Sequence, residues 1–169
     1  MKRIEFKIEN DDDETRKLRC SSSFNYICDI SNVYEYNDDE QFLMIKHLYD
    51  VTDFDNRLSL VKDIKTKIMS YQQQDKLKKK FSPDEFVTFK EVVDLLYNAR
   101  MDCYYCNKKV KVVYKYKRMP EQWTLDRIDN SKGHIKTNLV ISCLHCNLKR
   151  RCLNSDKYLF TKTLQIVKV

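Results

Sequence analysis

Four cysteines in two identical pairs are the residues of this sequence that are best suited to bind a metal ion. Cys103 and Cys106 form one C-x-x-C pair, and Cys143 and Cys146 form a second pair with the same spacing. Two intervening residues let both sulfurs of a pair point into one tetrahedral site, the geometry that Zn²⁺ prefers. Four thiolates would leave no position for water, so the sequence predicts a structural zinc ion whose binding contributes to folding. The alternatives are a redox pair or four unrelated cysteines.

The segment that contains the second pair is rich in polar and charged residues. Residues 123–151 run Trp-Thr-Leu-Asp-Arg-Ile-Asp-Asn-Ser-Lys-Gly-His-Ile-Lys-Thr-Asn-Leu-Val-Ile-Ser-Cys-Leu-His-Cys-Asn-Leu-Lys-Arg-Arg. This order resembles the HNH, or His-Me finger, endonuclease superfamily, most of all its zinc-bearing branch with two C-x-x-C pairs around a ββα-metal unit. The usual pattern there is Asp-His, a glycine-containing turn, an Asn, then C-x-x-C-Asn and basic residues. The similarity extends from Cys103 to Arg151, under a third of the 169 residues.

The resemblance implies roles for three residues of this segment. Asp126 and Asn147 match the two protein ligands of a catalytic divalent metal, and Asn138 matches the residue that braces the turn. Carboxylate and amide oxygens are hard ligands, which suit Mg²⁺ or Mn²⁺. Such an ion would stabilise the charge that develops on the scissile phosphate and on the leaving oxygen. The alternative for Asn147 is a simple capping or surface residue.

The position after the metal-binding Asp departs from the family pattern. Arg127 stands where the general-base His is usual, within Leu-Asp-Arg-Ile-Asp, and a guanidinium can bind phosphate but cannot accept a proton at neutral pH. His134, in the turn, is the best substitute base because its pKa suits proton transfer; the alternative is a turn-packing or phosphate-contacting residue. His145 could be a spare zinc ligand, a phosphate contact or an exposed helix residue. Asp129 could be a base, a second metal contact or a turn former.

Basic residues follow Asn147 directly, at Lys149, Arg150 and Arg151. The two arginines lie three and four residues after Asn147 and therefore share its helical face, where they and Arg127 could bind phosphates. The alternative is a solvated basic helix end beside the negative pole of the helix dipole.

The charge of the chain is unevenly distributed. Residues 1–60 carry 8 Lys/Arg and 14 Asp/Glu, a net −6, whereas residues 61–169 carry 24 Lys/Arg and 11 Asp/Glu, a net +13. The basic part suits a polyanion such as DNA or RNA, because binding would release counterions from the phosphates. The acidic part is a candidate face for a protein partner. Several tyrosines among the lysines could stack on bases or pack around the metal site: Tyr104, Tyr105, Tyr114 and Tyr116.

The hydrophobic pattern and the turn residues predict an α+β protein with a helical N-terminal region, and the resemblance implies that a zinc-bound, treble-clef-like ββα module follows it. We expect helices over 39–50, 56–80, 82–99 and 143–153, with a second possible cap at Thr88, and strands over 3–8, 110–116, 123–128 and 138–142. An acidic loop over 10–14 and a packed segment over 24–36 complete the N-terminal region. The expected boundary divides the chain into residues 1–80 and 81–169.

The sequence excludes some function classes and leaves three open. No apolar run of ~18 residues and no signal-peptide pattern is found, so we expect an intracellular protein, in cytoplasm or nucleus, with reduced thiols. Cys20, Cys28 and Cys152 are then expected to be buried thiols. The first hypothesis is a metal-dependent endonuclease; the second is a catalytically degenerate HNH-like module that binds nucleic acid; the third is a protein-interaction module.

Overall fold

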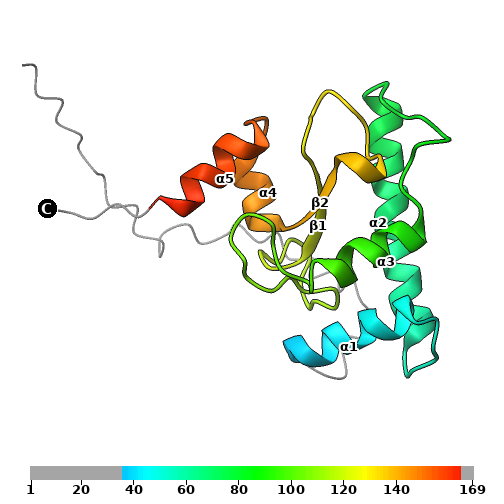
Figure 1. The fold of residues 1–169 in the computed structure, drawn as a ribbon. Coiled ribbons are helices and arrows are strands. Elements are labelled where there is room, and N and C mark those ends of the chain that lie inside the picture. The colour runs from blue at the N-terminus through cyan, green and yellow to red at the C-terminus, as the bar shows by residue number, and fades with distance from the viewer. Residues whose placement is uncertain (1–35, 165–169) are drawn as a thin grey trace, which may run out of the picture.

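The computed structural model describes residues 36–164, which place helices on both sides of one short antiparallel hairpin (Figure 1). The elements are, in chain order, α1 (Asp38–Tyr49), α2 (Arg57–Leu77), α3 (Phe89–Asn98), β1 (Trp123–Arg127), the 3-10 turn η2 (Lys136–Asn138), β2 (Leu139–Cys143), α4 (Leu144–Arg150) and α5 (Ser155–Thr163). This is the expected α+β architecture. The predicted strand over 3–8, the acidic loop over 10–14 and nearly all of the segment 24–36 lie outside the described residues.

The first two helices confirm the hydrophobic pattern of the N-terminal region. A capping box between Asn37 and Glu40 starts α1, because each side chain accepts a hydrogen bond from the backbone of the other. Helix α2 buries one face at four- and three-residue intervals. The residues of that face are Leu60, Ile64, Ile68, Tyr71 and Asp75. Three other apolar residues of this helix, Leu58, Met69 and Leu77, are exposed.

Helix α3 begins later than the Ser82–Pro83 signal predicts. Its cap is Thr88, whose hydroxyl accepts from the backbone of Glu91 while the Glu91 carboxylate accepts from the backbone of Thr88. The two preceding residues are extended, because Phe86 bridges to Ile135 and the N–H of Val87 donates to the carbonyl of His134. This pairing prevents a helix from starting at Ser82, so the second of the two predicted caps is the one that is used.

The predicted strand over 110–116 is not a regular strand. The backbone N–H groups of Val112 and Val113 both donate to the side-chain oxygen of Gln41 in α1, at 2.9 and 3.0 Å. Within the segment, Lys111 forms one isolated bridge with Gln122, and another isolated bridge, between Asp102 and Lys109, precedes the segment. Four apolar residues of the segment are nevertheless buried, Val110, Val112, Val113 and Tyr114, whereas Tyr116 is exposed, so burial follows the alternating pattern only in part.

The C-terminal part is a ββα unit with one additional helix. Strands β1 and β2 pair antiparallel from Trp123 opposite Cys143 to Arg127 opposite Leu139, and α4 follows β2 without a loop. Helix α4 ends at Arg150 because Arg151 has a positive φ of 52°. Asn154 then caps α5, which the sequence did not predict.

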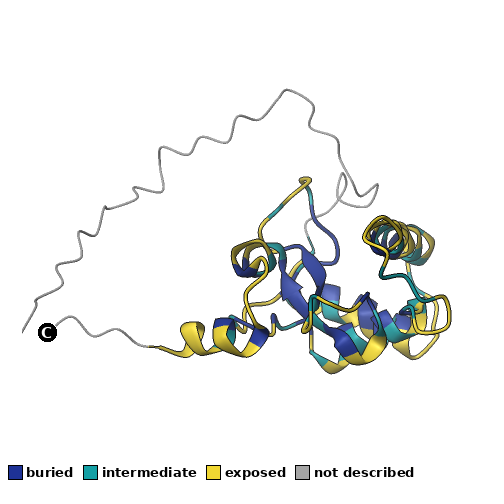
Figure 2. Cartoon of the chain, turned by 90° about the horizontal axis from the view of Figure 1, so that it is seen from above, coloured by how far each residue is buried: buried dark blue, intermediate teal, exposed yellow. Residues whose placement is uncertain are grey.

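One hydrophobic core joins the N-terminal helices to the ββα unit. The hairpin is buried between its neighbours, while the helices expose their outer faces (Figure 2). Several contacts cross the predicted boundary at residue 80: the Lys111 amine pairs with Asp38, and the Tyr71 hydroxyl accepts from the N–H of Leu125. These contacts join the described part of residues 1–80 to the ββα unit. The division of the chain at residue 80 stays a prediction. Among the described residues, no helix is long and apolar enough to cross a membrane.

Candidate functional site

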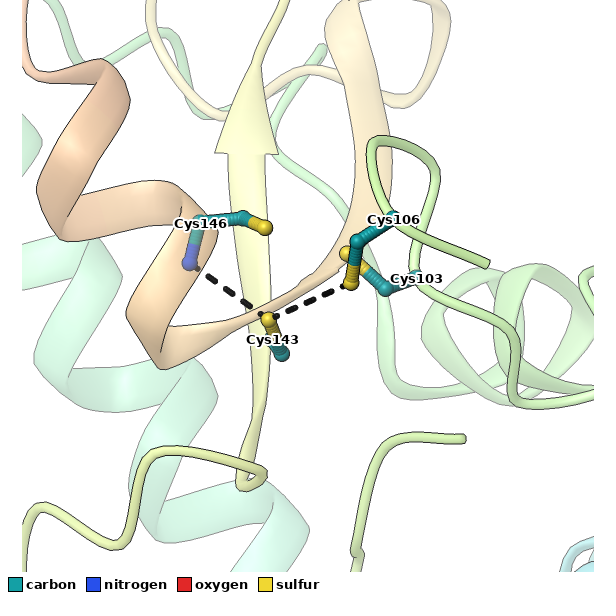
Figure 3. Close-up of side chains that lie close together, drawn as sticks. All are labelled: Cys103, Cys106, Cys143 and Cys146. Carbon is teal, nitrogen blue, oxygen red and sulfur yellow. Dashed lines mark hydrogen bonds between the residues drawn. The ribbon is translucent and has the colours of Figure 1, made fainter. Parts of the chain in front are cut away.

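The four cysteines predicted to bind a metal ion come together at the start of α4 (Figure 3). Their sulfur atoms all lie within 4.8 Å of one another, and Cys103, Cys143 and Cys146 are buried. Cys106 Sγ lies 3.9 Å from Cys143 Sγ, which also accepts from the backbone N–H of Cys146 at 3.4 Å. The cluster could hold one metal ion, an arrangement compatible with a zinc knuckle module.

The close contact of the thiols shifts their pKa values in opposite directions. The neighbouring Cys143 thiol lowers the pKa of Cys103 to about 4, whereas the contact with Cys103 and burial raise the pKa of Cys143. Burial raises the pKa of Cys146 to about 11. Four thiolates this close would repel one another, and a divalent cation would compensate that repulsion. Cys152, which we expected to be buried, is exposed; Cys20 and Cys28 lie outside the described residues.

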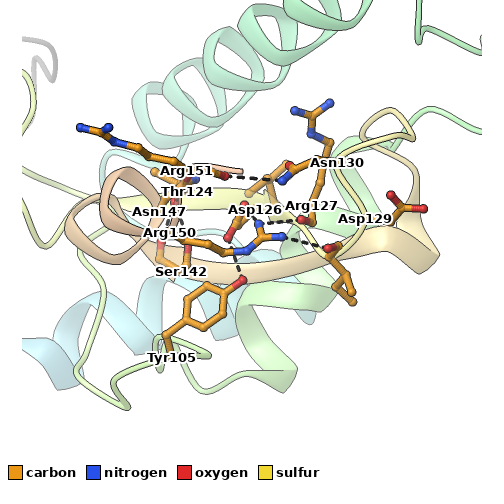
Figure 4. Close-up of polar contacts among 12 residues, drawn as sticks. Tyr105, Thr124, Asp126, Arg127, Asp129, Asn130, Ser142, Asn147, Arg150 and Arg151 are labelled. Atoms are coloured by element: carbon orange, nitrogen blue, oxygen red, sulfur yellow. Dashed lines mark hydrogen bonds and ion pairs between the residues drawn. The ribbon is translucent and has the colours of Figure 1, made fainter. Parts of the chain in front are cut away.

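Asp126 is buried between two hydrogen-bond donors (Figure 4). Its Oδ1 accepts from the Arg150 guanidinium at 2.7 Å, and its Oδ2 accepts from the Tyr105 hydroxyl at 2.8 Å. Arg150 also donates to the carbonyls of Arg127 and Ile128, at 2.8 and 2.9 Å. The sequence predicts that Arg150 shares the helical face of Asn147 and binds phosphate, but in the structure this side chain is buried and forms an ion pair with Asp126. Because α4 packs on β1 through this side chain, the guanidinium is enclosed; its two terminal nitrogens donate hydrogen bonds, while its buried Nε has no partner among the described residues.

Asn147 lies over the same face of β1 as Asp126. Its Nδ2 donates to the hydroxyl of Thr124 at 3.1 Å, and that hydroxyl donates to the carbonyl of Ser142 at 2.9 Å. Thr124 and Asp126 are two residues apart on a strand, so their side chains point to one face. No described residue bonds to Oδ1 of Asn147, which remains the atom able to bind a cation. The structure thus brings the expected ligand pair to one face of the hairpin.

A second metal ion has few protein ligands at this place. Within residues 36–164, the four cysteines are the sole group of three or more His, Cys, Asp or Glu side chains close enough to share an ion. A catalytic ion would depend on Asp126 and Asn147, with its other ligands from water or phosphate. It would also share the Asp126 carboxylate with Arg150.

Asn138 holds the ends of the turn between the two strands together. Its side chain donates to the carbonyls of Asp129 and Gly133 at 2.9 and 3.2 Å, and accepts from the N–H of Asp129 at 2.8 Å. Asp129 is exposed, and its carboxylate accepts from both the backbone and the hydroxyl of Ser131, which lowers the pKa of Asp129. These are the contacts of a turn former, one of the alternatives for Asp129.

His134 lies against α2, on the side of the hairpin away from α4. Its Nδ1 is 2.8 Å from Asp75 Oδ1, its backbone N–H donates to Asp75 Oδ2 at 2.6 Å, and its ring packs on Tyr71 with centroids 4.7 Å apart. Arg127 reaches the same carboxylate, with its guanidinium 3.8 Å from Asp75 Oδ1. Sequence reasoning missed Asp75. The available signal was an acidic residue on the buried face of α2, four residues after Tyr71.

Gly133 allows the turn to approach α2 this closely. A Cβ atom at this position would lie 2.4 Å from the carbonyl oxygen of Lys80 and 2.9 Å from Asp75 Oδ2. Gly133 is the only glycine of the chain, and its φ is not positive. A glycine is therefore needed here for the close approach of the two backbones and not for a left-handed conformation.

The remaining predicted contacts divide between surface and interior. Lys149, Arg151 and His145 are exposed on or beside α4, and Arg127 is half-buried. Of the four tyrosines that could pack around the metal site or stack on bases, Tyr105 and Tyr114 are buried, and Tyr104 and Tyr116 are exposed. His47, a residue to which we assign no functional role, hydrogen-bonds Thr52 and stacks on Phe54.

No family model, no curated protein and no solved structure matches this chain.

Proposed function

We propose that this protein is a metal-dependent endonuclease that hydrolyses phosphodiester bonds in nucleic acid, with DNA as its substrate. The observation that carries the proposal is the placement of Asp126 and Asn147 on one face of the hairpin, with Asn147 in the first turn of the helix that begins at the cysteine cluster. The resemblance to the HNH superfamily assigns these two positions to the ligands of the catalytic metal.

We further propose that the cysteine cluster holds a structural Zn²⁺ through Cys103, Cys106, Cys143 and Cys146. Four sulfur ligands complete the tetrahedral coordination that zinc prefers, so the ion would take no part in hydrolysis. Its function would be to fix the start of α4 against β2, and with it the position of Asn147.

The other residues of the proposed site would orient groups and supply charge. Asp126 and Asn147 would hold Mg²⁺ or Mn²⁺, which when bound would stabilise the charge on the reacting phosphate. Tyr105 holds the Asp126 carboxylate in one orientation. Arg127, Arg151 and Lys149 would bind the flanking phosphates, because a guanidinium or ammonium close to a phosphate forms a charge-assisted hydrogen bond.

A second candidate function is nucleic-acid binding without cleavage. It is favoured by the ion pair of Asp126 with Arg150, which already gives the carboxylate a cationic partner. Arg127 also favours binding without cleavage, because it stands where a general-base histidine is usual and a guanidinium cannot accept a proton. A protein partner for the acidic residues 1–60 stays a prediction; of these the structure describes 36–60, where Asp38 pairs with Lys111 of the same chain.

Nicking of supercoiled plasmid with Mg²⁺ or Mn²⁺ tests the proposal. We expect the zinc-loaded wild type to nick the plasmid and Asp126→Ala to lose that activity. A matched control is Asp84→Asn, which changes an exposed carboxylate in the turn before α3. Circular dichroism and zinc content would establish that each variant is folded.

The two candidate functions differ in their outcomes. Salt-sensitive DNA binding by the wild type and by Asp126→Ala, with no nicking by either, would replace the endonuclease with the binding module. DNA binding that does not depend on the salt concentration would count against both nucleic-acid functions and favour a protein-interaction module.

A further inference from the structure

Helix α5 packs against the rest of the molecule through two residues that carry hydroxyl groups. Its buried residues are Ser155 and Tyr158, with exposures of 1% and 6%, whereas Phe160 of the same helix is 63% exposed. Neither hydroxyl has a hydrogen-bond partner among residues 36–164. Buried polar groups are usually paired, because an unpaired group has lost its hydrogen bonds to water and gained none. The face that α5 buries therefore needs an explanation other than apolar contact.

The ring of Tyr158 lies against the first cysteine pair. It meets the ring of Tyr105 edge to face, with centroids 5.0 Å apart and an interplanar angle of 74°. Tyr105 stands between Cys103 and Cys106 in the sequence and is itself buried. The contact between the two rings fixes α5 to the segment that supplies two of the four sulfur atoms.

The second cysteine pair also lies beside Tyr158. Burial raises the pKa of Tyr158, and the thiols of Cys146, Cys143 and Cys103 raise it further, Cys146 by side-chain contact as well as by charge. The contact with Cys146 does not meet the geometry of a hydrogen bond. A buried hydroxyl without a partner thus adjoins a cluster of sulfur atoms that could hold a cation.

The sulfur atoms become better hydrogen-bond acceptors when they bind a metal ion. A neutral thiol is a weak acceptor, whereas a thiolate carries a charge that strengthens the bond it accepts. Four thiolates also carry more negative charge than one Zn²⁺ neutralises. Hydrogen bonds from neighbouring groups spread this charge and orient the ligands, as Cys143 Sγ already shows by accepting the backbone N–H of Cys146.

We propose that the Tyr158 hydroxyl donates a hydrogen bond to the zinc-bound thiolate of Cys146 and thereby increases the affinity of the cluster for the metal. This inference rests on the proposed zinc site and is independent of the endonuclease activity. Tyr158 would be a positioning residue of the metal centre, with its ring held by Tyr105 and its hydroxyl directed at the sulfur. Helix α5 would thus support the metal centre although it supplies no ligand.

The alternative is that Tyr158 only fills space beside Tyr105. Tyr158→Phe separates the two roles, because it removes the hydroxyl and keeps the ring. If the hydroxyl stays unpaired when zinc is bound, its removal leaves zinc binding unchanged or stronger. If the hydroxyl donates to the thiolate, its removal weakens zinc binding. Tyr104→Phe is the matched control, since Tyr104 belongs to the same cysteine pair but is exposed.

The test measures metal binding by the full chain, for the wild type and both variants. Competition with a chromophoric chelator gives the affinity for Zn²⁺, and we expect Tyr158→Phe to lower it about 10- to 100-fold, the usual cost of losing a group that hydrogen-bonds a metal ligand. The sulfur-to-metal charge-transfer absorption of the Co²⁺-substituted protein should move to longer wavelength in Tyr158→Phe, because a sulfur without its donor releases electrons more readily. Tyr104→Phe should match the wild type in both measurements.

The contrary outcomes separate this inference from the zinc site. Wild-type or higher zinc affinity in Tyr158→Phe would overturn the inference and leave the four-cysteine site in place. Weaker binding with an unmoved Co²⁺ absorption would also overturn it, because the loss would then come from packing. A wild type that binds no zinc would overturn the zinc site and this inference together.

Discussion

The guanidinium of Arg150 lies 2.7 Å from the carboxylate of Asp126, and both side chains are buried. Arg150 therefore neutralises the carboxylate that the endonuclease proposal assigns to a divalent metal. It also donates to the carbonyls of Arg127 and Ile128 and so joins the end of β1 to α4. The pair makes Asp126 a structural residue as well as a candidate metal ligand. Both the stability and the activity of a variant at Asp126 must therefore be measured.

We expect removal of Arg150 to destabilise the fold strongly. Arg150→Ala would leave the Asp126 carboxylate buried without its cation, which costs about 3–5 kcal/mol for pairs of this kind. Urea denaturation measures the free energy of unfolding. Lys109→Ala is the control, because Lys109 pairs with Asp102 on the surface, where such a pair is worth about 1 kcal/mol or less. Equal losses in the two variants would contradict the assignment of Arg150 as a structural residue.

The cysteine cluster and the exposed Cys152 should respond differently to substitution. We expect Cys146→Ser to lose the bound zinc and its cooperative melting, because structural zinc binding contributes directly to folding free energy. Cys152→Ser should keep one zinc per chain and melt like the wild type. Elemental analysis and thermal melting check both. Full zinc retention by Cys146→Ser would exclude the four-cysteine site.

The sequence specified the elements whose signals are local. The C-x-x-C spacing predicted a cluster that the structure brings together, and the capping box at Thr88 and Glu91 gave the true start of α3. The first cap at Ser82 failed because Val87 pairs with His134, 47 residues further along the chain. A local signal cannot reveal which of two caps a distant backbone contact will leave available.

The features that the sequence did not predict depend on contacts between distant segments. The segment 110–116 has the pattern of a strand, but Gln41 of α1 takes its backbone N–H groups. Asp75 can hydrogen-bond His134 only because Gly133 lets the turn approach α2. Arg150 and Arg151 are neighbours with the same side chain, yet one is enclosed and the other exposed, since α4 ends between them.

This difference between the two arginines predicts different effects on DNA binding. Arg151→Ala should weaken binding to duplex DNA and reduce the slope of log K against log salt by about 1, because one phosphate contact is lost. Lys46→Ala, which changes an exposed residue of α1, should leave that slope unchanged. Fluorescence anisotropy over a salt series measures it. The wild-type slope in Arg151→Ala would remove Arg151 from the nucleic-acid interface.

Lys67 should make stability depend on pH. This lysine of α2 donates to Gln122 and to the Trp123 carbonyl, and burial lowers its pKa to about 7 from an ordinary 10.5. Between these values the unfolded chain binds more protons than the folded one, so this residue's contribution to stability rises with pH from about 7 to 10.5. The rings of Trp123 and Tyr114 oppose the effect by favouring the charged amine.

Denaturation of the wild type and of Lys67→Met across that pH range measures this linkage. The stability difference between them should change in favour of the wild type as the pH rises. Lys65→Met, which changes an exposed lysine of the same helix, should show no such trend. A constant difference for Lys67→Met would mean that the aromatic rings keep the amine charged.

The most direct test of the endonuclease proposal uses Asn147, because its substitution leaves the Asp126–Arg150 ion pair in place. Plasmid nicking would be measured for the wild type and for zinc-loaded Asn147→Ala, each over a range of Mg²⁺ and Mn²⁺ concentrations. The proposal predicts nicking by the wild type that requires the divalent ion, and loss of that nicking in Asn147→Ala while DNA binding is retained. Equal, metal-independent nicking by both proteins, or none by either, would contradict it.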